Sequence, residues 1–349
     1  MRSGAVAHLG GLWAWDPTEV TSDLRALDSG GRWGVVLPYA GPPVLVRFSQ
    51  WSITPPEADI GPWTGVPKDR WASSLSQEQY IAGVRRIHEH IASGEVYQVN
   101  LCRVLEADIE PNNDIVALHR ALAAGNPAPY ASMMSVPDMD LHVACASPEL
   151  FLRREGNVLS SGLIKGTAPS SGLLLDKDLA ENVMIVDLVR NDLSRVAHTG
   201  SVRVPDLLRI EEHPGLVHLV SDVQCRLSEG TRWSDIVDAT FPPGSVTGAP
   251  KSSALRIIDE CETAPRDVYC GAVGWIDADR QAAELAVAIR TFWIRDDVLR
   301  FGTGAGITWG SDPHGEWQET ELKASNLCDI ASRPVPAHRS VPMLRSATG

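Results

Sequence analysis

Residues 242–252 read PPGSVTGAPKS, a glycine-rich stretch ending near a lysine, and they bear most directly on the fold. In a phosphate-binding P-loop the last glycine stands directly before the lysine, so that backbone N–H groups and the amine meet on one anion. Here Ala249 and Pro250 separate Gly248 from Lys251, and proline lacks a backbone donor. The stretch is therefore not a P-loop. It still offers N–H groups, a hydroxyl and a lysine at a helix start, which suits a carboxylate, a phosphate or a plain turn.

Strands and helices alternate irregularly, and often in pairs, on both sides of this stretch. Apolar residues at helical spacing predict helices over residues 76–94, 114–124, 176–196, 251–261 and 317–330. Alternating or continuous apolar runs predict strands over residues 95–109, 142–153, 158–161, 217–227, 270–276, 285–294 and 298–301, with a loop over 162–172. This order favours an α+β fold over a Rossmann-type winding.

The chain of 349 residues has enough length for two domains or one large α+β unit. Its first 75 residues, rich in Trp, Gly and Pro, are expected to form a β-rich subdomain integrated with the core. Residues 76–333 would form the catalytic domain, and residues 334–349 are expected to be a disordered tail.

Composition and charge exclude several classes of protein. The net charge of −13 argues against a nucleic-acid partner, and no apolar run is as long as a membrane span. Six scattered cysteines without a C-x-x-C pair indicate reduced thiols and not a disulfide framework. We therefore expect a cytoplasmic protein with neither nucleic-acid nor membrane partners.

Two pairs of carboxylates lie one helical turn apart. Asp178 and Glu181 share one side of a predicted helix, and Glu316 and Glu319 have the same spacing. Each pair could belong to a solvated helix face or to a site for a hard cation such as Mg²⁺, which prefers carboxylate oxygens. No cluster of His and Cys indicates zinc.

Several single residues elsewhere could have either a structural or a functional role. Lys165 follows a predicted strand, where a surface turn and a reactive buried amine are both possible. Arg290 stands in an apolar strand and needs an anion, either a structural carboxylate or that of a substrate. Gly304 and Gly306 permit close backbone approach to a ligand, and His218 on a polar strand face would ordinarily be structural.

A series of ordered segments carries a family resemblance. They read GEVYQVNL (94–101), SPE (147–149), IKGT (164–167), ENVMIVDLVRNDL (181–193), VHLVS (217–221), GSVTGAPK (244–251), AIRT (288–291), GAGI (304–307) and EWQET (316–320). In this order they resemble the chorismate-utilising enzymes, which include anthranilate synthase, aminodeoxychorismate synthase, and the isochorismate and salicylate synthases. The resemblance covers about residues 77–329 and implies large mixed or antiparallel β-sheets packed face to face with helices outside, as in anthranilate synthase component I.

Two features discriminate within the family. Anthranilate synthases tend to carry Ala where this chain has Lys165, and aminodeoxychorismate synthases have the lysine, although Leu163 replaces their usual Pro. Isochorismate and salicylate synthases typically lack the run at residues 184–192. The resemblance thus implies aminodeoxychorismate synthase component I, which converts chorismate and ammonia to 4-amino-4-deoxychorismate for 4-aminobenzoate and folate. Anthranilate synthase, isochorismate or salicylate synthase, and a non-catalytic chorismate-binding homologue are the alternatives.

The resemblance also implies a role for each matching residue. The catalytic set would be Lys165 as the nucleophile at ring C2, Glu149 as the proton donor to the leaving 4-hydroxyl, and His218. The substrate-binding set would be Thr247, Tyr269, Arg290, Gly304, Ala305, Gly306 and Lys323. Mg²⁺ would be held by Glu181, Glu316 and Glu319, with Asp178 in or near the shell. No amidotransferase cysteine motif is visible, so a separate glutamine amidotransferase subunit is expected to supply ammonia.

Overall fold

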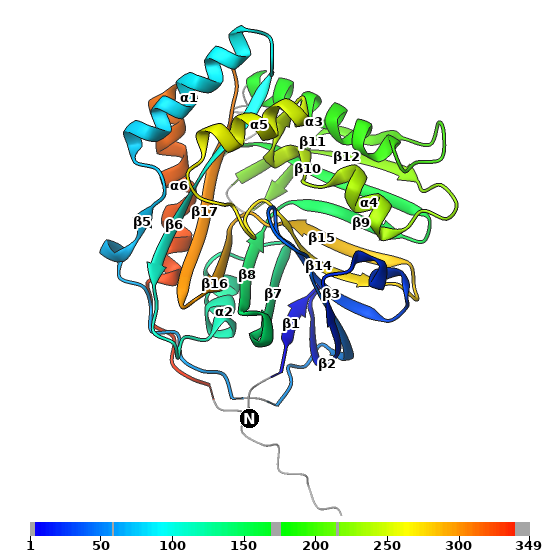
Figure 1. Cartoon of the computed structure of the whole chain (residues 1–349), viewed down its shortest axis with the longest axis vertical. Helices are drawn as coiled ribbons and strands as arrows, with labels where there is room; N and C mark the ends of the chain where they lie inside the picture. Colours follow the sequence, from blue (N-terminus) through cyan, green and yellow to red (C-terminus); the bar gives the residue numbers. More distant parts are fainter. Residues whose placement is uncertain (1–3, 58, 169–175, 214–215, 339–349) are drawn as a thin grey trace, which may run out of the picture.

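The computed structural model describes residues 4–57, 59–168, 176–213 and 216–338 (Figure 1). Within these ranges the description does not extend to the side chains of residues 165, 167, 168, 176–178, 213 and 216. The strands are β1 (Val6–Leu9), β2 (Leu12–Thr21), β3 (Arg32–Leu37), β4 (Val44–Ser52), β5 (Ala72–Ser73), β6 (Gln98–Asp108), β7 (Tyr130–Val136), β8 (Leu141–Ser147), β9 (Leu150–Glu155), β10 (Val158–Ala168), β11 (Arg203–His213), β12 (Leu216–Arg226), β13 (Gly248–Ala249), β14 (Ala272–Asp277), β15 (Ala282–Val287), β16 (Thr291–Arg295) and β17 (Val298–Ile307). The helices are α1 (Gln77–Ala92), α2 (Ile115–Gly125), α3 (Asp176–Ser194), α4 (Trp233–Thr240), α5 (Lys251–Cys261) and α6 (Pro313–Ala331).

The described strands pair into one antiparallel ladder. Its order is β11-β12-β10-β9-β15-β14-β3-β4-β2-β1-β7-β8-β16-β17-β6, and β5 and β13 pair with the other edge of β6. Val223 of β12 and Val104 of β6, from near the two ends of the ladder, belong to the same hydrophobic cluster. The sheet therefore curls around a shared core, and the predicted α+β class is confirmed.

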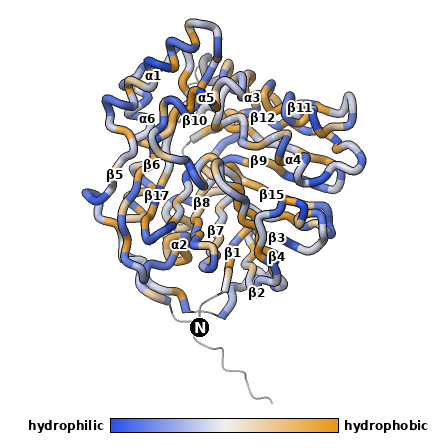
Figure 2. The backbone as a smooth tube through the Cα atoms, in the orientation of Figure 1, coloured by the Kyte–Doolittle hydropathy of each residue, from blue (hydrophilic) through white to orange (hydrophobic). Residues whose placement is uncertain are grey.

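The helices cover the outside of this sheet (Figure 1). α3 contacts β10 and β12, α6 contacts β17, and α2 contacts β7 and β8. α1 begins with a capping box, in which the Gln79 N–H donates to Ser76 Oγ and the Ser76 N–H donates to Gln79 Oε1. Hydrophobic residues concentrate in the strands, and the outward turns of the helices are largely hydrophilic (Figure 2). None of the described helices is both long and apolar enough to span a bilayer.

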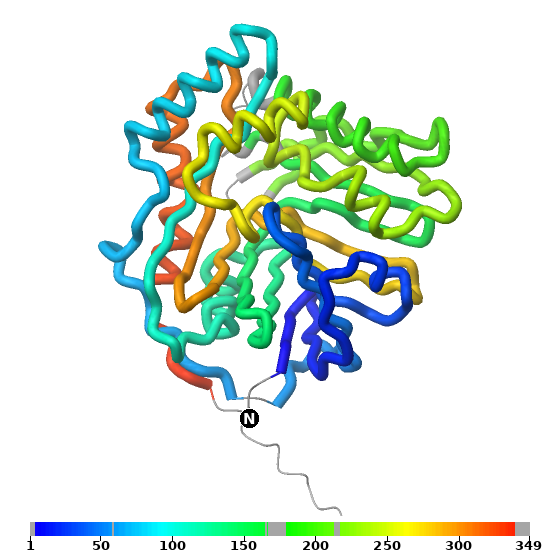
Figure 3. Tube along the Cα trace, viewed as in Figure 1, coloured from blue at the N-terminus to red at the C-terminus, as the bar shows by residue number. Residues whose placement is uncertain are grey.

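The amino-terminal strands are part of the same ladder and lie beside strands from distant parts of the chain (Figure 3). β1 pairs with β7, and β3 pairs with β14. The segment that follows them also reaches the carboxyl-terminal region, where Trp63 and Ile60 form β-bridges with Val335 and His338. Residues 334–338, placed in a disordered tail on sequence grounds, are thus paired with backbone. The rest of that tail lies outside the described residues.

Candidate active site

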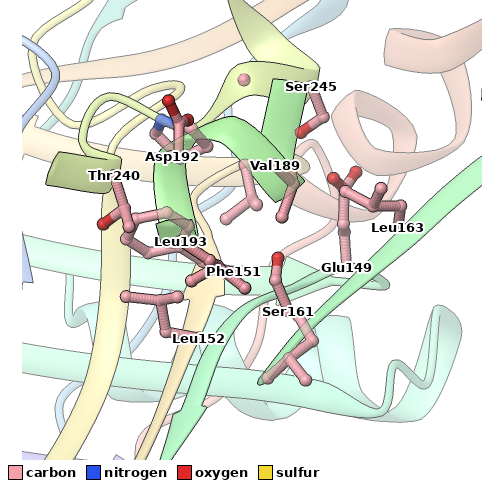
Figure 4. A pocket seen from close by; sticks show the side chains of 14 residues that line it. Glu149, Phe151, Leu152, Ser161, Leu163, Val189, Asp192, Leu193, Thr240 and Ser245 are labelled. Atoms are coloured by element: carbon pink, nitrogen blue, oxygen red, sulfur yellow. The ribbon is translucent and has the colours of Figure 1, made fainter. Parts of the chain in front are cut away.

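A narrow pocket opens between β9, β10, α3 and the segment that follows α4 (Figure 4). Its walls are mostly apolar, and its polar side chains are Glu149, Ser161, Asp192, Thr240 and Ser245. Glu149 lies in the turn between β8 and β9 and is 5% exposed. Its N–H donates to Ser147 Oγ (3.2 Å) and its C=O accepts from the Val287 N–H (3.0 Å), which fixes the turn. Figure 4 shows the Glu149 carboxylate at the same end of the pocket as the Ser245 hydroxyl. A buried carboxyl in such surroundings suits proton transfer.

Lys165 lies in β10 and not in a loop, so the loop predicted over 162–172 is wrong for its first half. β10 continues to pair with β12 up to Ala168. The register shifts between Ile164 and Thr167, where Gly166 has φ +84°, so the strand bulges at residues 165–166. β-Bulges commonly redirect a side chain next to an active site. The side chain of Lys165 itself lies outside the described part.

His218 stands directly opposite Thr167 in the β10–β12 ladder, one residue pair from the bulge. It is partly buried, as is Glu181 on α3, which covers this strand. The neighbour of Glu181, Asn182, anchors α3 because its Oδ1 accepts from Ser221 Oγ (2.6 Å). The backbone therefore brings β10, His218 and the Glu181 region together at one end of β12. The Asp178 side chain is outside the described residues.

The other two predicted metal ligands lie near the start of α6. Glu316 is buried and Glu319 is half-exposed. Burial, followed by the charges of Cys102, Glu316 and Glu319, raises the pKa of the Tyr80 hydroxyl well above its usual range, so both carboxylates lie near this hydroxyl. Glu319 Oε1 pairs with Lys323 Nζ at 2.7 Å, and the same amine donates to the Gly304 C=O at 2.9 Å.

These carboxylates have the donor chemistry that Mg²⁺ prefers. Among the described residues, however, no three acidic, His or Cys side chains are grouped closely enough to hold a metal ion. The structure brings Glu316 and Glu319 together on α6, whereas Glu181 is supplied by α3. The three-residue metal set stays a prediction.

The glycines of β17 are required by packing inside the sheet. β17 pairs with β6, and Gly306 stands opposite Asn100. A Cβ at Gly306 would overlap the amide of Gln98, a side chain that is 1% exposed. The Gln98 Oε1 has no hydrogen-bond partner among the described residues. Gln98 is a further candidate site residue, which lies within the segment GEVYQVNL but is marked by no local pattern of its own.

Tyr269 is buried against β17. A Cβ at Gly302 would overlap its ring, so the absence of a side chain at that position makes room for the tyrosine. The Tyr269 hydroxyl lies 4.0 Å from Cys102 Sγ, and burial raises its pKa well above the usual range. The hydroxyl is therefore neutral at physiological pH and can donate a hydrogen bond.

Arg290 lies in the link between β15 and β16 and not in a strand, as the sequence had suggested. Its φ is +52°, and its C=O accepts from the Ala146 N–H (3.0 Å), close to the turn that carries Glu149. Burial lowers the pKa of its guanidinium, and no carboxylate of the described residues forms an ion pair with it. A desolvated cation is stabilised by an anion, so Arg290 could bind an anionic ligand, and its role stays a prediction.

The glycine-rich stretch serves as a fixed turn. Thr247 is fully buried, its hydroxyl donates to the Gly244 C=O (3.1 Å), and its own C=O accepts from the Asn100 N–H (2.7 Å). Lys251 Nζ donates to Asp192 Oδ2 (2.6 Å) and to the carbonyls of Thr240 (3.1 Å) and Pro242 (2.9 Å). All three ammonium protons are satisfied within the protein, so the suggestion that this lysine holds a ligand anion is wrong.

Comparison with known proteins places this chain in a family. The model for chorismate binding enzymes matches residues 62–329. Anthranilate synthase component 1 of Neisseria meningitidis serogroup B is 38% identical over 271 residues, which cover 74% of this chain and 54% of that protein. A probable chloroplastic aminodeoxychorismate synthase of Oryza sativa is 36% identical over 279 residues, which cover 75% of this chain and 30% of that protein. The chain therefore spans about half the length, or less, of these curated relatives.

The fold agrees with these matches. The crystal structure of anthranilate synthase component I from Streptococcus pneumoniae superimposes with a TM-score of 0.76 at 22% identity, covering 94% of this chain and 93% of that one. The ordered segments of the sequence, the curled antiparallel sheet and the family match over residues 62–329 lead to one conclusion. The chain belongs to the chorismate binding enzyme family.

Proposed function

We propose that this chain is component I of an aminodeoxychorismate synthase, which replaces the 4-hydroxyl of chorismate by an amino group. The observation that carries the proposal is Lys165, at a position where anthranilate synthases tend to carry alanine. Its location supports this role, since the bulge in β10 lies one residue pair from His218. A lysine amine freed of its proton is a competent nucleophile.

The proposed reaction has two displacement steps. Glu149 gives a proton to the 4-hydroxyl, which leaves as water while the Lys165 amine adds to ring C2. Ammonia then adds at C4 and expels Lys165, which restores the ring and the free amine. His218, across the ladder from Thr167, would line the same region. The sum is chorismate plus ammonia giving 4-amino-4-deoxychorismate plus water.

Substrate binding would use the buried polar groups described above. Arg290, without a carboxylate partner among the described residues, would hold the enolpyruvyl carboxylate, and Tyr269 would donate to it. The other residues proposed to bind chorismate are Thr247, Gly304, Ala305, Gly306 and Lys323. Glu181, Glu316 and Glu319 would hold Mg²⁺, which when bound would neutralise the ring carboxylate.

Ammonia would come from a separate glutamine amidotransferase subunit. This part of the proposal is supported by the word "component" in the names of relatives such as the meningococcal anthranilate synthase. The second candidate function is anthranilate synthesis, which the name of that relative at 38% identity favours. The two differ in whether pyruvate is lost from the ring.

Product analysis tests both candidates. The purified chain is incubated with chorismate, an ammonium salt and Mg²⁺, and the products are separated by chromatography with a parallel assay for pyruvate. We expect 4-amino-4-deoxychorismate without pyruvate, and loss of turnover on chelation with EDTA that added Mg²⁺ reverses. Anthranilate with an equal amount of pyruvate would establish the second candidate instead. An absence of chorismate consumption would contradict both.

A further inference from the structure

Arg266 is a buried cation whose donors are directed at the main chain of the site. It follows α5 and is 2% exposed. Its Nε and Nη2 donate to the two carboxylate oxygens of Glu262 (2.8 and 2.6 Å). Nη1 donates to the Val246 C=O (2.7 Å), and Nη2 also donates to the Asn100 C=O (2.8 Å). The guanidinium packs 4.6 Å from the centre of the Tyr39 ring.

These bonds reach three segments that carry predicted substrate-binding residues. Val246 directly precedes Thr247 in the glycine-rich turn. Asn100 stands opposite Gly306 in the β6–β17 ladder. The Tyr269 N–H donates to the C=O of Arg266 itself at 2.9 Å. One side chain and its own carbonyl therefore connect the turn, the glycine strand and the tyrosine.

Glu262 extends the connection to a second point on β6. Its Oε1 accepts from the Cys102 N–H (2.8 Å) as well as from Arg266. A buried ion pair usually adds little net stability compared with well-packed apolar residues. The flat, permanently charged guanidinium can, however, donate at fixed angles to several acceptors at once, which a lysine cannot do. This geometry indicates a role in holding backbone segments at set positions.

We propose that Arg266 is a positioning residue for substrate binding, which fixes the glycine-rich turn, β6 and Tyr269 relative to one another around the chorismate pocket. It acts through Thr247, Tyr269 and the β17 glycines and does not touch the substrate. The inference rests on the proposed function only in taking chorismate as the ligand. It holds for amination and for anthranilate formation alike.

The test compares the buried Arg266 with Arg32, which is partly buried. Arg266→Lys keeps the charge but loses the planar set of guanidinium donors. Arg32→Lys is the matched control, since Arg32 of β3 lies between the rings of Trp51 on β4 (4.1 Å) and Trp275 on β14 (4.5 Å). Both variants are assayed for chorismate consumption and for melting temperature. We expect Arg266→Lys to raise KM for chorismate about tenfold or more with kcat changed less than about threefold, because binding geometry is lost. Arg32→Lys should lower the melting temperature without moving KM.

Glu262→Gln is the second variant, and it replaces Arg266→Lys in the test if that protein does not fold. Glu262→Gln preserves shape and the acceptor for Cys102 but weakens the hold on the guanidinium. It should raise KM in the same direction by a smaller factor. An unchanged KM in folded Arg266→Lys, or in Glu262→Gln where the first variant is insoluble, would overturn the proposal. The KM is measured from the consumption of chorismate and does not depend on which product forms. An anthranilate product would therefore overturn the proposed function without contradicting the role of Arg266.

Discussion

Lys165 is the residue on which the choice between two reactions depends. Replacing it by alanine removes the proposed nucleophile while the strand pairing of β10 with β12 is retained. We expect Lys165→Ala to lower kcat for chorismate and ammonia on the order of a thousandfold. Lys68→Ala, which removes an exposed lysine paired with Asp329, is the control and should keep full activity. Turnover by Lys165→Ala at the wild-type rate would show that the amine is not the nucleophile.

Gly302 provides the second test at this scale. A methyl group there would overlap the Tyr269 ring, so Gly302→Ala must displace the tyrosine or the strand. Overpacking of this kind destabilises a core by about 1–3 kcal/mol. We expect a lower midpoint of urea unfolding together with a higher KM for chorismate. Gly310→Ala, where a Cβ meets no atom within 4 Å, should behave as wild type, and equal effects of the two substitutions would refute this account.

Residue types could be predicted from the sequence better than residue partners. Arg290 could be singled out because an ionisable group in an apolar stretch is informative by itself, and its guanidinium is indeed desolvated. Its role in binding substrate stays a prediction, as does that of Glu149, which is buried. The role of Lys251 could not be decided from the sequence, since its partner Asp192 lies 59 positions earlier in the chain. Gln98 was missed for the same reason. Its significance comes from Gly306 on a neighbouring strand, which no local pattern reveals.

At the scale of elements, the extents of α2 and α5 were predicted well, whereas the start of α6 at Pro313 and most strand ends were not. The helix at 114–124 is observed as α2 (Ile115–Gly125), and the helix predicted at 251–261 is α5. The strand at 158–161 continues to Ala168 because β12 supplies backbone partners across a bulge, despite two glycines that locally favour a loop. β7, β11 and α4 were not predicted at all. Strand extent depends on pairing between distant segments, which a single sequence does not show.

Lys251 joins the start of α5 to α3 and to the segment that follows α4. Lys251→Met would leave the Asp192 carboxylate buried without its cation, and breaking a buried pair in this way destabilises a fold by about 3–5 kcal/mol. We therefore expect Lys251→Met to unfold at a lower urea concentration than the wild type. The double variant Lys251→Met/Asp192→Leu removes the stranded charge and should recover part of the loss. If the double variant were less stable than the single one, the stranded-charge explanation would fail.

For the whole molecule, acid sensitivity should arise in part where β1 meets α2. His8 Nδ1 lies 2.9 Å from His119 Nε2, and burial, followed by the charges of His8 and Arg120, lowers the pKa of His119 to about 3. Between pH 3 and pH 6.5, His119 is protonated in the unfolded chain but not in the folded one. The contribution of the neutral histidine to the free energy of unfolding is therefore fully present above pH 6.5 and is lost as the pH falls toward 3. For one histidine the loss from pH 7 to pH 5 is about 2 kcal/mol.

This difference is measurable as the change in unfolding free energy between pH 7 and pH 5. His119→Leu should reduce that change by about 2 kcal/mol, whatever its effect at pH 7. His198→Gln, at an exposed position, should leave it unaltered. A His119→Leu variant with the same pH dependence as the wild type would exclude the His8–His119 pair as the source.

The bridges from Trp63 and Ile60 to Val335 and His338 have a consequence for how such chains can be rearranged. Trp63 is fully buried, and its indole N–H donates to the C=O of Ala331, the last residue of α6 (2.7 Å). The helix that presents Glu319 and Lys323 is thus tethered at its far end by a segment located before the first helix. A recombination joining residues 76–338 to a foreign amino-terminal unit would leave that end of α6 without its anchor. Related chains that share this helix should therefore also retain the segment around Trp63. The family match is consistent with this, because it begins at residue 62.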